Sequence, residues 1–194
     1  DYVSREAWRE ASLPFCPNHR QGGCSLARHG TYERKTPPGT RIARWYCRES
    51  HTTFYLLPNC LAARLPGSLT TLEEAVLVAE QAPSLEAAAA LLRPSIELPG
   101  ALRWLRRRRQ YVHHTLIVMI GLLPELLVGC APTVTAVRCR LGQNAVLMHL
   151  RGGAASYLSS LPAPLGFSSL ATAAGDVTRR HQQPMGPDPP VSAA

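Results

Sequence analysis

The sequence predicts an α+β protein, in which a small β-hairpin module precedes an all-α domain and a disordered C-terminal tail. Residues 14–58 are rich in Pro, Gly, Cys, His and aromatic residues and have no helical period. A segment of this kind is too small to build a large core and needs an additional stabilising cross-link, such as a disulfide or a bound metal. From residue 68 apolar residues recur at helical spacing, and after residue 168 Gly, Ala, Ser and Pro dominate. The expected divisions are an amphipathic lead (1–13), the hairpin module (14–66), the helical domain (67–150) and a low-complexity, mostly disordered tail (151–194).

The chain is strongly basic. It has 21 Lys and Arg residues against 13 Asp and Glu residues, a net charge of +8 and a pI near 9.6. Lys35 is the only lysine, so the other 20 cations are arginines. Arginine suits phosphate and guanine, although a GC-rich genome produces the same preference for Arg over Lys. The net charge itself favours a polyanionic partner.

Four of the six cysteines lie in the first third of the chain, among three histidines. An even number of cysteines permits disulfides, but the first residues are polar and charged and do not resemble a secretory signal. We therefore expect a cytoplasmic protein in a reducing environment, where crowded Cys and His residues indicate a metal cluster. Cys130 and Cys139 are expected to be ordinary buried thiols.

A turn between two strand-like segments forms the expected hairpin. The turn is Thr36-Pro37-Pro38-Gly39-Thr40, and residues 31–34 and 41–46 flank it. The hairpin carries cations that we expect to contact phosphates of DNA, namely Arg34, Lys35, Arg41 and Arg44.

The metal cluster is expected at two chain turns, each supplying two of the four ligands of a tetrahedral zinc ion. Cys47 and His51, separated by three residues, form one pair. Cys16 belongs to the other pair, and its partner is either Cys24, which the Gly22-Gly23 turn allows to approach, or His19. We favour Cys24, because thiolate is the commoner zinc ligand. The expected Zn²⁺ ligands are Cys16, Cys24, Cys47 and His51, with His19 as the alternative to Cys24 and with Cys60 and His29 as possible substitutes. A shell made only of protein groups indicates a structural ion.

Three helices are expected after residue 68. Thr70 and Thr71 each precede a glutamate by three residues, which is the pattern of a capping box at the start of the first helix. The second helix covers residues 85–92, and the third runs from about Pro99 through Arg109 or beyond. Helical spacing gives this third helix an apolar face (Leu98, Ala101, Leu102, Leu105 and Val112) and an opposite face that we expect to approach DNA bases (Arg103, Arg106, Arg107 and Gln110).

The motifs in this order resemble the zinc ribbon of bacterial insertion-sequence transposases and related mobile-element proteins. They are Cys16-Pro17, the run from Arg28 to Arg34, the run from Arg44 to Glu49, and the run from Thr53 to Pro58. In that family a helix-turn-helix follows and ends in an Arg-Trp-Leu-Arg type sequence, here Arg103 to Arg106. The resemblance covers about residues 14–110. It implies a zinc ribbon followed by a helix-turn-helix-like domain.

The chain departs from the family pattern at one ligand. Ser50 stands where the family usually has its fourth cysteine, and His51 follows where glycine is common. Either His51 replaces the cysteine, or the site is weakened or empty. We expect replacement, because imidazole reaches further than a thiolate.

Catalytic and membrane functions are not expected. A transposase needs three acidic residues around two metal ions, whereas the only aspartates are Asp1, Asp176 and Asp188. The apolar segment 115–137 is interrupted by Pro124, Glu125 and Pro132, so buried helices or a self-association surface are a better interpretation than a transmembrane helix.

The resulting hypothesis is a non-enzymatic, nucleoid-associated protein that binds double-stranded DNA and has no small-molecule substrate. The alternative is an adaptor that binds a separate recombinase, or another copy of itself, through segment 115–137. The DNA target, the oligomeric state and the choice between regulator, targeting subunit and transposase remnant stay open.

Overall fold

The computed structural model describes residues 2–168, so the expected disorder of residues 169–194 lies outside the described part of the chain. These residues form two compact units. We call residues 2–34 and 39–56 the sheet unit, and residues 35–38 and 57–168 the helical unit. The chain thus has an α+β fold, with an antiparallel sheet preceding the helices, as the sequence predicts. The expected boundary at 66/67 falls ten residues after the end of the sheet unit.

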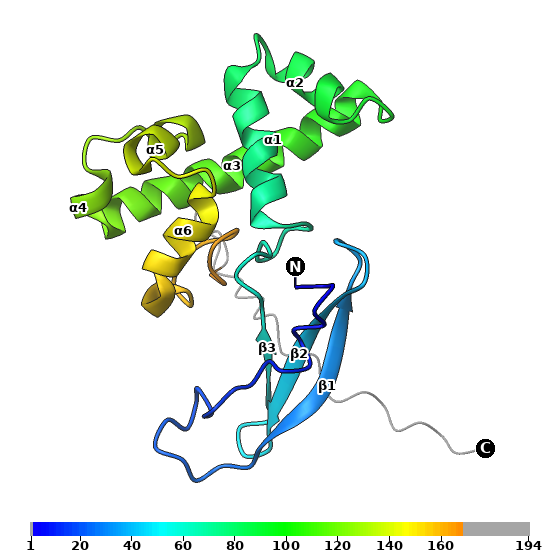
Figure 1. Cartoon of the computed structure of the whole chain (residues 1–194), viewed down its shortest axis with the longest axis vertical. Helices are drawn as coiled ribbons and strands as arrows, with labels where there is room; N and C mark the ends of the chain where they lie inside the picture. Colours follow the sequence, from blue (N-terminus) through cyan, green and yellow to red (C-terminus); the bar gives the residue numbers. More distant parts are fainter. Residues whose placement is uncertain (1, 169–194) are drawn as a thin grey trace, which may run out of the picture. The chain divides into compact units, whose positions relative to one another are not determined.

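The sheet has three antiparallel strands in the order β1-β2-β3 (Figure 1): β1 (Leu26–Arg34), β2 (Thr40–Cys47) and β3 (Thr52–Leu56). The expected hairpin is β1 and β2, which pair from Arg34 opposite Thr40 to Leu26 opposite Cys47. The register shifts between Arg28 and Thr31. Strand β3 was not foreseen as a strand, and its pairing with β2 places Thr52 opposite Cys47. Cys47 is therefore held between both neighbouring strands.

The expected amphipathic lead forms successive turns and packs on the strands of the sheet unit. Trp8 is buried there, and the guanidinium group of Arg28 donates to the carbonyl groups of Trp8 and Arg9. The hydroxyl group of Tyr2 donates to the carbonyl of Arg41 over 2.8 Å. These contacts fix the lead along β1 and β2, so it extends the small core of the sheet.

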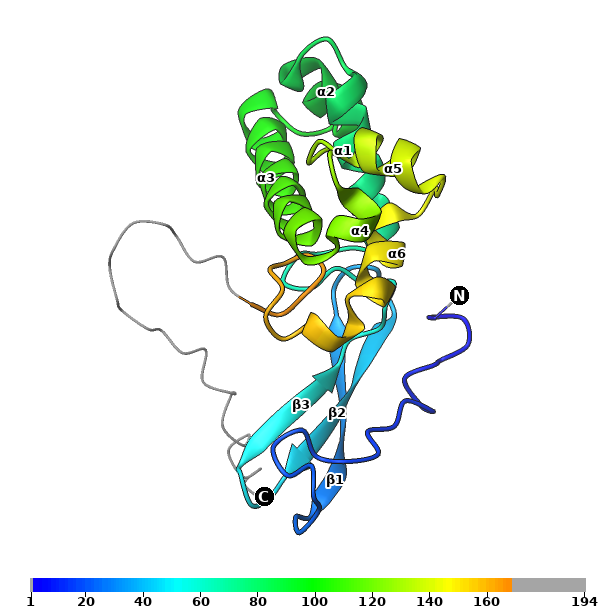
Figure 2. The same cartoon turned by 90° about the vertical axis from the view of Figure 1, so that its left-hand side faces the viewer.

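The helical unit contains six α-helices and a 3₁₀ turn within the described residues (Figure 2): α1 (Leu69–Gln81), α2 (Leu85–Leu92), α3 (Leu98–Leu122), α4 (Pro124–Leu127), α5 (Val134–Leu141), α6 (Val146–Gly153) and η1 (Ala155–Tyr157). Helix α1 packs against α2, α3, α5 and α6. The first three helices lie where the sequence predicts them, and α3 continues beyond Arg109 to Leu122. None of the helices within residues 2–168 combines the length and the apolar character that crossing a bilayer requires.

The start of α1 differs from the expected capping boxes at Thr70 and Thr71. Ser68 is the N-cap residue, and its hydroxyl accepts a hydrogen bond from the backbone N–H of Thr71. Ser84 caps α2 in the same way through Ala87. The side chain of the residue just before a helix can accept a hydrogen bond from the free N–H groups of the first turn. The cap is therefore Ser68, two residues before the first of the expected threonines.

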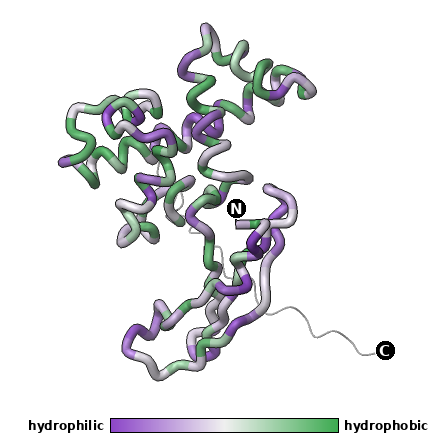
Figure 3. The backbone as a smooth tube through the Cα atoms, in the orientation of Figure 1, coloured by the Kyte–Doolittle hydropathy of each residue, from purple (hydrophilic) through white to green (hydrophobic). Residues whose placement is uncertain are grey.

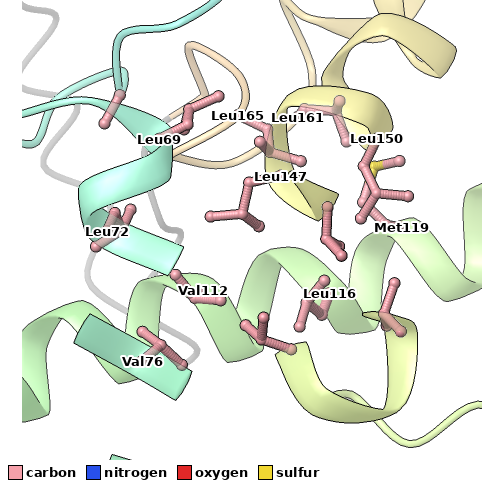
Figure 4. Packing of buried hydrophobic residues seen from close by; sticks show 14 of the residues in the cluster. Leu69, Leu72, Val76, Val112, Leu116, Met119, Leu147, Leu150, Leu161 and Leu165 are labelled. Atoms are coloured by element: carbon pink, nitrogen blue, oxygen red, sulfur yellow. The ribbon is translucent and has the colours of Figure 1, made fainter. Parts of the chain in front are cut away.

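A large apolar core joins α1, α3, α5 and α6 (Figure 4). Leu116 and Met119, in the expected apolar segment, are fully buried there. Hydrophobic positions accordingly dominate the second half of α3 in the hydropathy view (Figure 3). A smaller cluster joins α2 to α3 through short side chains, Ala88, Ala89 and Ala101, with Leu105.

The expected start of the low-complexity tail at residue 151 falls inside α6. Residues that follow it complete the core, since Leu161 and Leu165 are buried against α3 and α6 residues. The hydroxyl of buried Thr115 donates to the carbonyl of Ala163 over 2.7 Å. Cys139, expected to be a buried thiol, is exposed on α5, and Cys130 is half-buried.

Buried Arg151 of α6 holds the segment that follows β3. Its Nη1 atom donates to the carbonyl oxygens of Pro58 at 3.3 Å, Asn59 at 3.2 Å and Leu61 at 2.6 Å. A charged group that is 1 % exposed is stable in a core only where such acceptors surround it. Helix α6 therefore holds residues 58–61, within the segment between β3 and α1 that begins the helical unit.

Candidate metal centre and basic surfaces

Four potential ligand atoms meet in the sheet unit. They belong to Cys16, His19, Cys24 and Cys47, and all lie within 4.8 Å of one another. Cys16 and Cys47 are buried, and His19 and Cys24 are half-buried. A group of three thiols and one imidazole at these distances could hold a metal ion. The structure thus brings together both of the residues, His19 and Cys24, between which the sequence left a choice.

The local chain path explains why three of these residues converge. A tight turn brings His19 back to Cys16, with the His19 N–H donating to the Cys16 carbonyl over 3.1 Å. Gly22 and Gly23 then both adopt positive φ angles, of 86° and 83°, which residues with a side chain rarely adopt. This reversal returns Cys24 to the cluster immediately before β1 begins.

Two distances within the cluster are close to those of a tetrahedral metal site. The Nδ1 atom of His19 lies 3.4 Å from the Cys16 sulfur and 3.5 Å from the Cys47 sulfur. A tetrahedral zinc ion with Zn–S near 2.3 Å and Zn–N near 2.0–2.1 Å has S···N edges of about 3.6 Å. A ring nitrogen has one lone pair or one N–H and makes at most one well-directed hydrogen bond, whereas a central cation could contact the nitrogen and both sulfurs.

The thiols of the cluster have opposite tendencies to ionise. Desolvation, with the neighbouring Cys16 and Cys47 thiols, raises the pKa of Cys24 to about 12. The hydroxyl and the backbone N–H of Ser50 lower the pKa of Cys47 to about 7. Crowded thiolates repel one another unless a cation lies between them, and a bound metal deprotonates its thiol ligands. The cluster is therefore favourable mainly for a positively charged occupant.

Polar groups around the cluster link its two turns. The side-chain amide of Asn18 donates to the hydroxyl of Ser50 over 3.3 Å and to that of Thr52 over 3.5 Å. The Glu49 carboxylate accepts from the backbone N–H of Ser25 over 2.8 Å, which lowers the pKa of Glu49. Such an outer layer fixes the positions of ligands in metal sites. The sequence analysis gave Asn18 and Glu49 no part in the site, although each lies two residues after a cysteine of the cluster.

His51 does not join the cluster. It adopts a left-handed conformation with φ of 49°, is exposed, and its Nδ1 atom lies 3.0 Å from the Tyr46 hydroxyl. The residue at the family's fourth ligand position, Ser50, instead interacts with the Cys47 thiol. The possible substitutes also lie elsewhere: His29 is on β1 beside Arg44, and Cys60 belongs to the helical unit.

The four cations of the hairpin have different environments. Lys35 and Arg41 are exposed, and Arg34 is half-buried and engaged by neighbouring groups. The Arg44 guanidinium donates to the His29 carbonyl over 3.2 Å and contacts the His29 ring at the same distance. Of the four, Lys35 and Arg41 are the most accessible to a polyanion.

The four polar residues expected to form one face of α3 are all exposed. Arg103 donates to the carbonyl of Pro99 over 3.3 Å, and the Arg107 guanidinium lies 5.7 Å from the Tyr111 ring centre. Arg106 is 3.8 Å from Glu86, and the two side chains are 61 % and 50 % exposed. Gln110 is exposed beside them. On the apolar side Leu105 and Val112 are buried as expected, but Leu98 is exposed.

Arg108 belongs to neither of the two faces that the sequence predicts for α3. It is buried against Trp104. Its guanidinium lies 4.0 Å from the indole ring centre, and that of Arg93 lies 5.0 Å from the same ring. Burial, followed by the charges of Arg93 and Arg107, lowers the pKa of Arg108 to about 10. The contact with the ring offsets part of this cost. Two arginines and one tryptophan thus fix the start of α3 to the end of α2.

Comparison of the chain with protein-family models, curated proteins and solved structures found no match. Inference about function therefore depends on the clusters and surfaces described above.

Proposed function

We propose that the chain is a non-catalytic, zinc-stabilised protein that binds double-stranded DNA. The metal cluster carries this proposal, because it is a set of ligands that sequence-distant segments bring within bonding range of one ion. In this proposal the sheet unit is a zinc ribbon, and α1 to α3 form a helix-turn-helix-like domain with α3 as the recognition helix.

Zinc is the metal that the ligand types favour. Three thiolates and one imidazole are a common structural zinc set, and calcium or magnesium would require oxygen ligands. In this site Cys16, His19, Cys24 and Cys47 would hold the ion and close its coordination shell. The ion would supply the sheet unit with stability that its small core does not provide.

Helix α3 supports the DNA-binding part of the proposal. It exposes Arg103, Arg106, Arg107 and Gln110 within two helical turns, while Leu105 and Val112 hold its other side in the fold. Guanidinium and amide groups on one helix face suit the acceptors in a major groove. Lys35 and Arg41 would add contacts to phosphates from the hairpin.

Binding to duplex DNA at increasing salt tests this function. We expect a mobility shift at low salt whose log Kd rises linearly with log salt concentration, because each phosphate contact releases a counterion. The protein should carry about one zinc ion per chain, measured by elemental analysis of the same sample. The proposal fails if the zinc-loaded protein shows no affinity for DNA at low salt.

One observation favours the adaptor as a second candidate. Segment 115–137 exposes three large apolar side chains, Ile117 at 49 %, Leu126 at 45 % and Val128 at 65 %. Exposed apolar side chains that lie near one another along the chain are common at protein interfaces. Light scattering of wild-type protein and of a Leu126→Ser/Val128→Ser variant distinguishes the candidates. The adaptor is favoured if the wild-type protein self-associates and has no affinity for DNA, and if the variant no longer self-associates.

A further inference from the structure

A cavity of about 520 Å³ lies within the helical unit, between α1, α2, α3 and the segment that precedes α5. Its volume is in the range of small-molecule sites. The metal cluster is in the other unit, so the two features are separate. The residues around this cavity divide into a basic wall and an apolar floor.

The basic wall is one stripe of α3. Arg106, Arg109, Gln110 and His113 follow one another at the spacing of a single helix face, and all four line the cavity. The ring of His113 is held in place, because its Nδ1 atom donates to the carbonyl of Pro132 over 2.9 Å. Two arginines, a glutamine and a histidine whose ring is held by Pro132 therefore border one space.

The carboxylate in this lining is already engaged. Glu80 accepts from the backbone N–H of Val134 through Oε1 at 2.8 Å, and from the N–H and hydroxyl of Thr135 through Oε2 at 2.8 and 2.6 Å. Its charge is thus directed at the N-terminus of α5, where the helix dipole stabilises it. Glu86, 3.8 Å from Arg106, pairs with it in solvent-exposed surroundings, where ion pairs are weak. The wall keeps a positive character.

The floor of the cavity is apolar. Leu85 of α2 and Pro132 are half-buried and offer apolar surface to the cavity, whereas Val76 of α1 and Val112 of α3 also belong to the lining but are each only 1 % exposed. A simple ion would not use this surface. A ligand that carries an anionic group on an apolar body would contact both the wall and the floor.

We propose that this cavity binds a small organic anion, with its phosphate or carboxylate group on Arg106, Arg109 and Gln110 and its apolar body on Leu85 and Pro132. Arg106 and Gln110 also belong to the proposed DNA-binding face. The ligand and duplex DNA therefore compete for these two side chains, an extension that rests on the proposed function. The anion-binding site itself does not depend on it.

Phenyl phosphate is a suitable probe, because it has one anionic group and one small apolar body. We expect saturable binding to the full chain, followed by calorimetry and by shifts of amide resonances in α3. Inorganic phosphate lacks the apolar body and benzyl alcohol lacks the charge, so each should bind at least about tenfold more weakly than phenyl phosphate. Equal affinity for phenyl phosphate and either comparison compound overturns the proposal.

Two exposed arginines provide matched variants. Arg109→Ala should weaken phenyl phosphate binding at least about tenfold, and Arg109→Lys should keep most of it, because a charged hydrogen-bond donor remains. Arg140→Ala removes the same charge from α5, outside the cavity, and should leave the affinity unchanged. Equal losses in Arg109→Ala and Arg140→Ala, at unchanged helix content, would show that only general charge matters and overturn the site.

Competition is measured separately. At saturating phenyl phosphate and constant ionic strength, the Kd for duplex DNA should rise at least about threefold in wild-type protein and stay unchanged in Arg109→Ala. If the ligand binds and DNA affinity stays constant, the competition is overturned while the site stands. If the chain binds no DNA at all, the proposed function fails and the ligand-binding experiments still decide the site.

Discussion

The Glu73 carboxylate accepts a hydrogen bond from the backbone N–H of Leu147, with an Oε2···N distance of 2.9 Å. Its other oxygen accepts from Val146 at 3.1 Å, so a buried side chain of α1 occupies the N-terminus of α6. Helix α6 has no side-chain cap of its own. Two helical turns later Glu80 binds the N-terminus of α5 in the same way. One helix therefore caps two others, which places α5 and α6 on α1.

Glu73→Ala should destabilise the helical unit by about 2–4 kcal/mol, because two buried N–H groups lose their acceptor and a cavity forms. The measurement is urea unfolding of the full chain followed by helical circular dichroism. Glu74→Ala is the matched control, since it removes the same charge from an exposed position of α1. Its effect should stay within about 0.5 kcal/mol. Equal midpoints for the two variants would contradict the capping role of Glu73.

The ligand set can be tested by metal content. Cys16→Ser, Cys24→Ser, Cys47→Ser and His19→Ala should each lose most of the bound zinc, because each removes one of four closely spaced ligand atoms. His51→Ala should retain the metal, as should Cys139→Ser, which removes an exposed thiol from the helical unit. Elemental analysis of the purified variants provides the comparison. Zinc retained in His19→Ala and lost in His51→Ala would restore the ligand set expected from the sequence.

Removal of zinc by a chelator should release the constraint on the sheet unit and leave the helices largely unchanged. The cluster lies in the sheet unit, whereas the large apolar core lies in the helical unit. Amide hydrogen exchange of zinc-loaded and chelator-treated protein measures this directly. We expect faster exchange in β1 to β3 and similar exchange in α1 and α3. Equal acceleration in both sets of elements would show that the ion does not act on one unit alone.

The acidity of Cys47 should depend on Ser50. The hydroxyl of Ser50 favours the thiolate, so the pKa of Cys47 lies at about 7 instead of the ordinary 9.0. In metal-free protein the lowered pKa makes folding more favourable above pH 9, and this contribution is lost as the pH falls through 7. Thiolate absorbance near 240 nm should show a first midpoint near pH 7 that moves upward in Ser50→Ala. An unchanged first midpoint in that variant would assign the acidity to another cause.

Arg107→Ala should weaken binding to duplex DNA about three- to tenfold at low salt. It should also reduce the slope of log Kd against log salt concentration by about one. Arg107 is exposed on α3, and its removal costs the helix only the contact with the Tyr111 ring. Arg5→Ala provides the control, because Arg5 is also exposed and lies in the lead outside the proposed binding faces. Fluorescence anisotropy titrations at several salt concentrations measure both effects. Similar losses in the two variants would indicate attraction by net charge alone.

Local signals in the sequence predicted much of the fold. The hairpin follows from the turn at residues 36–40, and α1 to α3 follow from the spacing of apolar residues. The choice of ligands depended on longer-range geometry. The turn that folds His19 onto Cys16, and the left-handed conformation that directs His51 elsewhere, leave no periodic signal. Composition was also misleading for residues 151–168, where Gly, Ser and Pro surround two buried leucines of the core.

The burial of Leu161 and Leu165 in that core has a consequence for biosynthesis. During translation the strands of the sheet unit leave the ribosome first and can pair, since all of their partners precede residue 57. The core of the helical unit is complete only when the two leucines have emerged, about a hundred residues later. Nascent α1 and α3 therefore stay partly unpacked for several seconds at ordinary elongation rates, and in that interval chaperones can bind them.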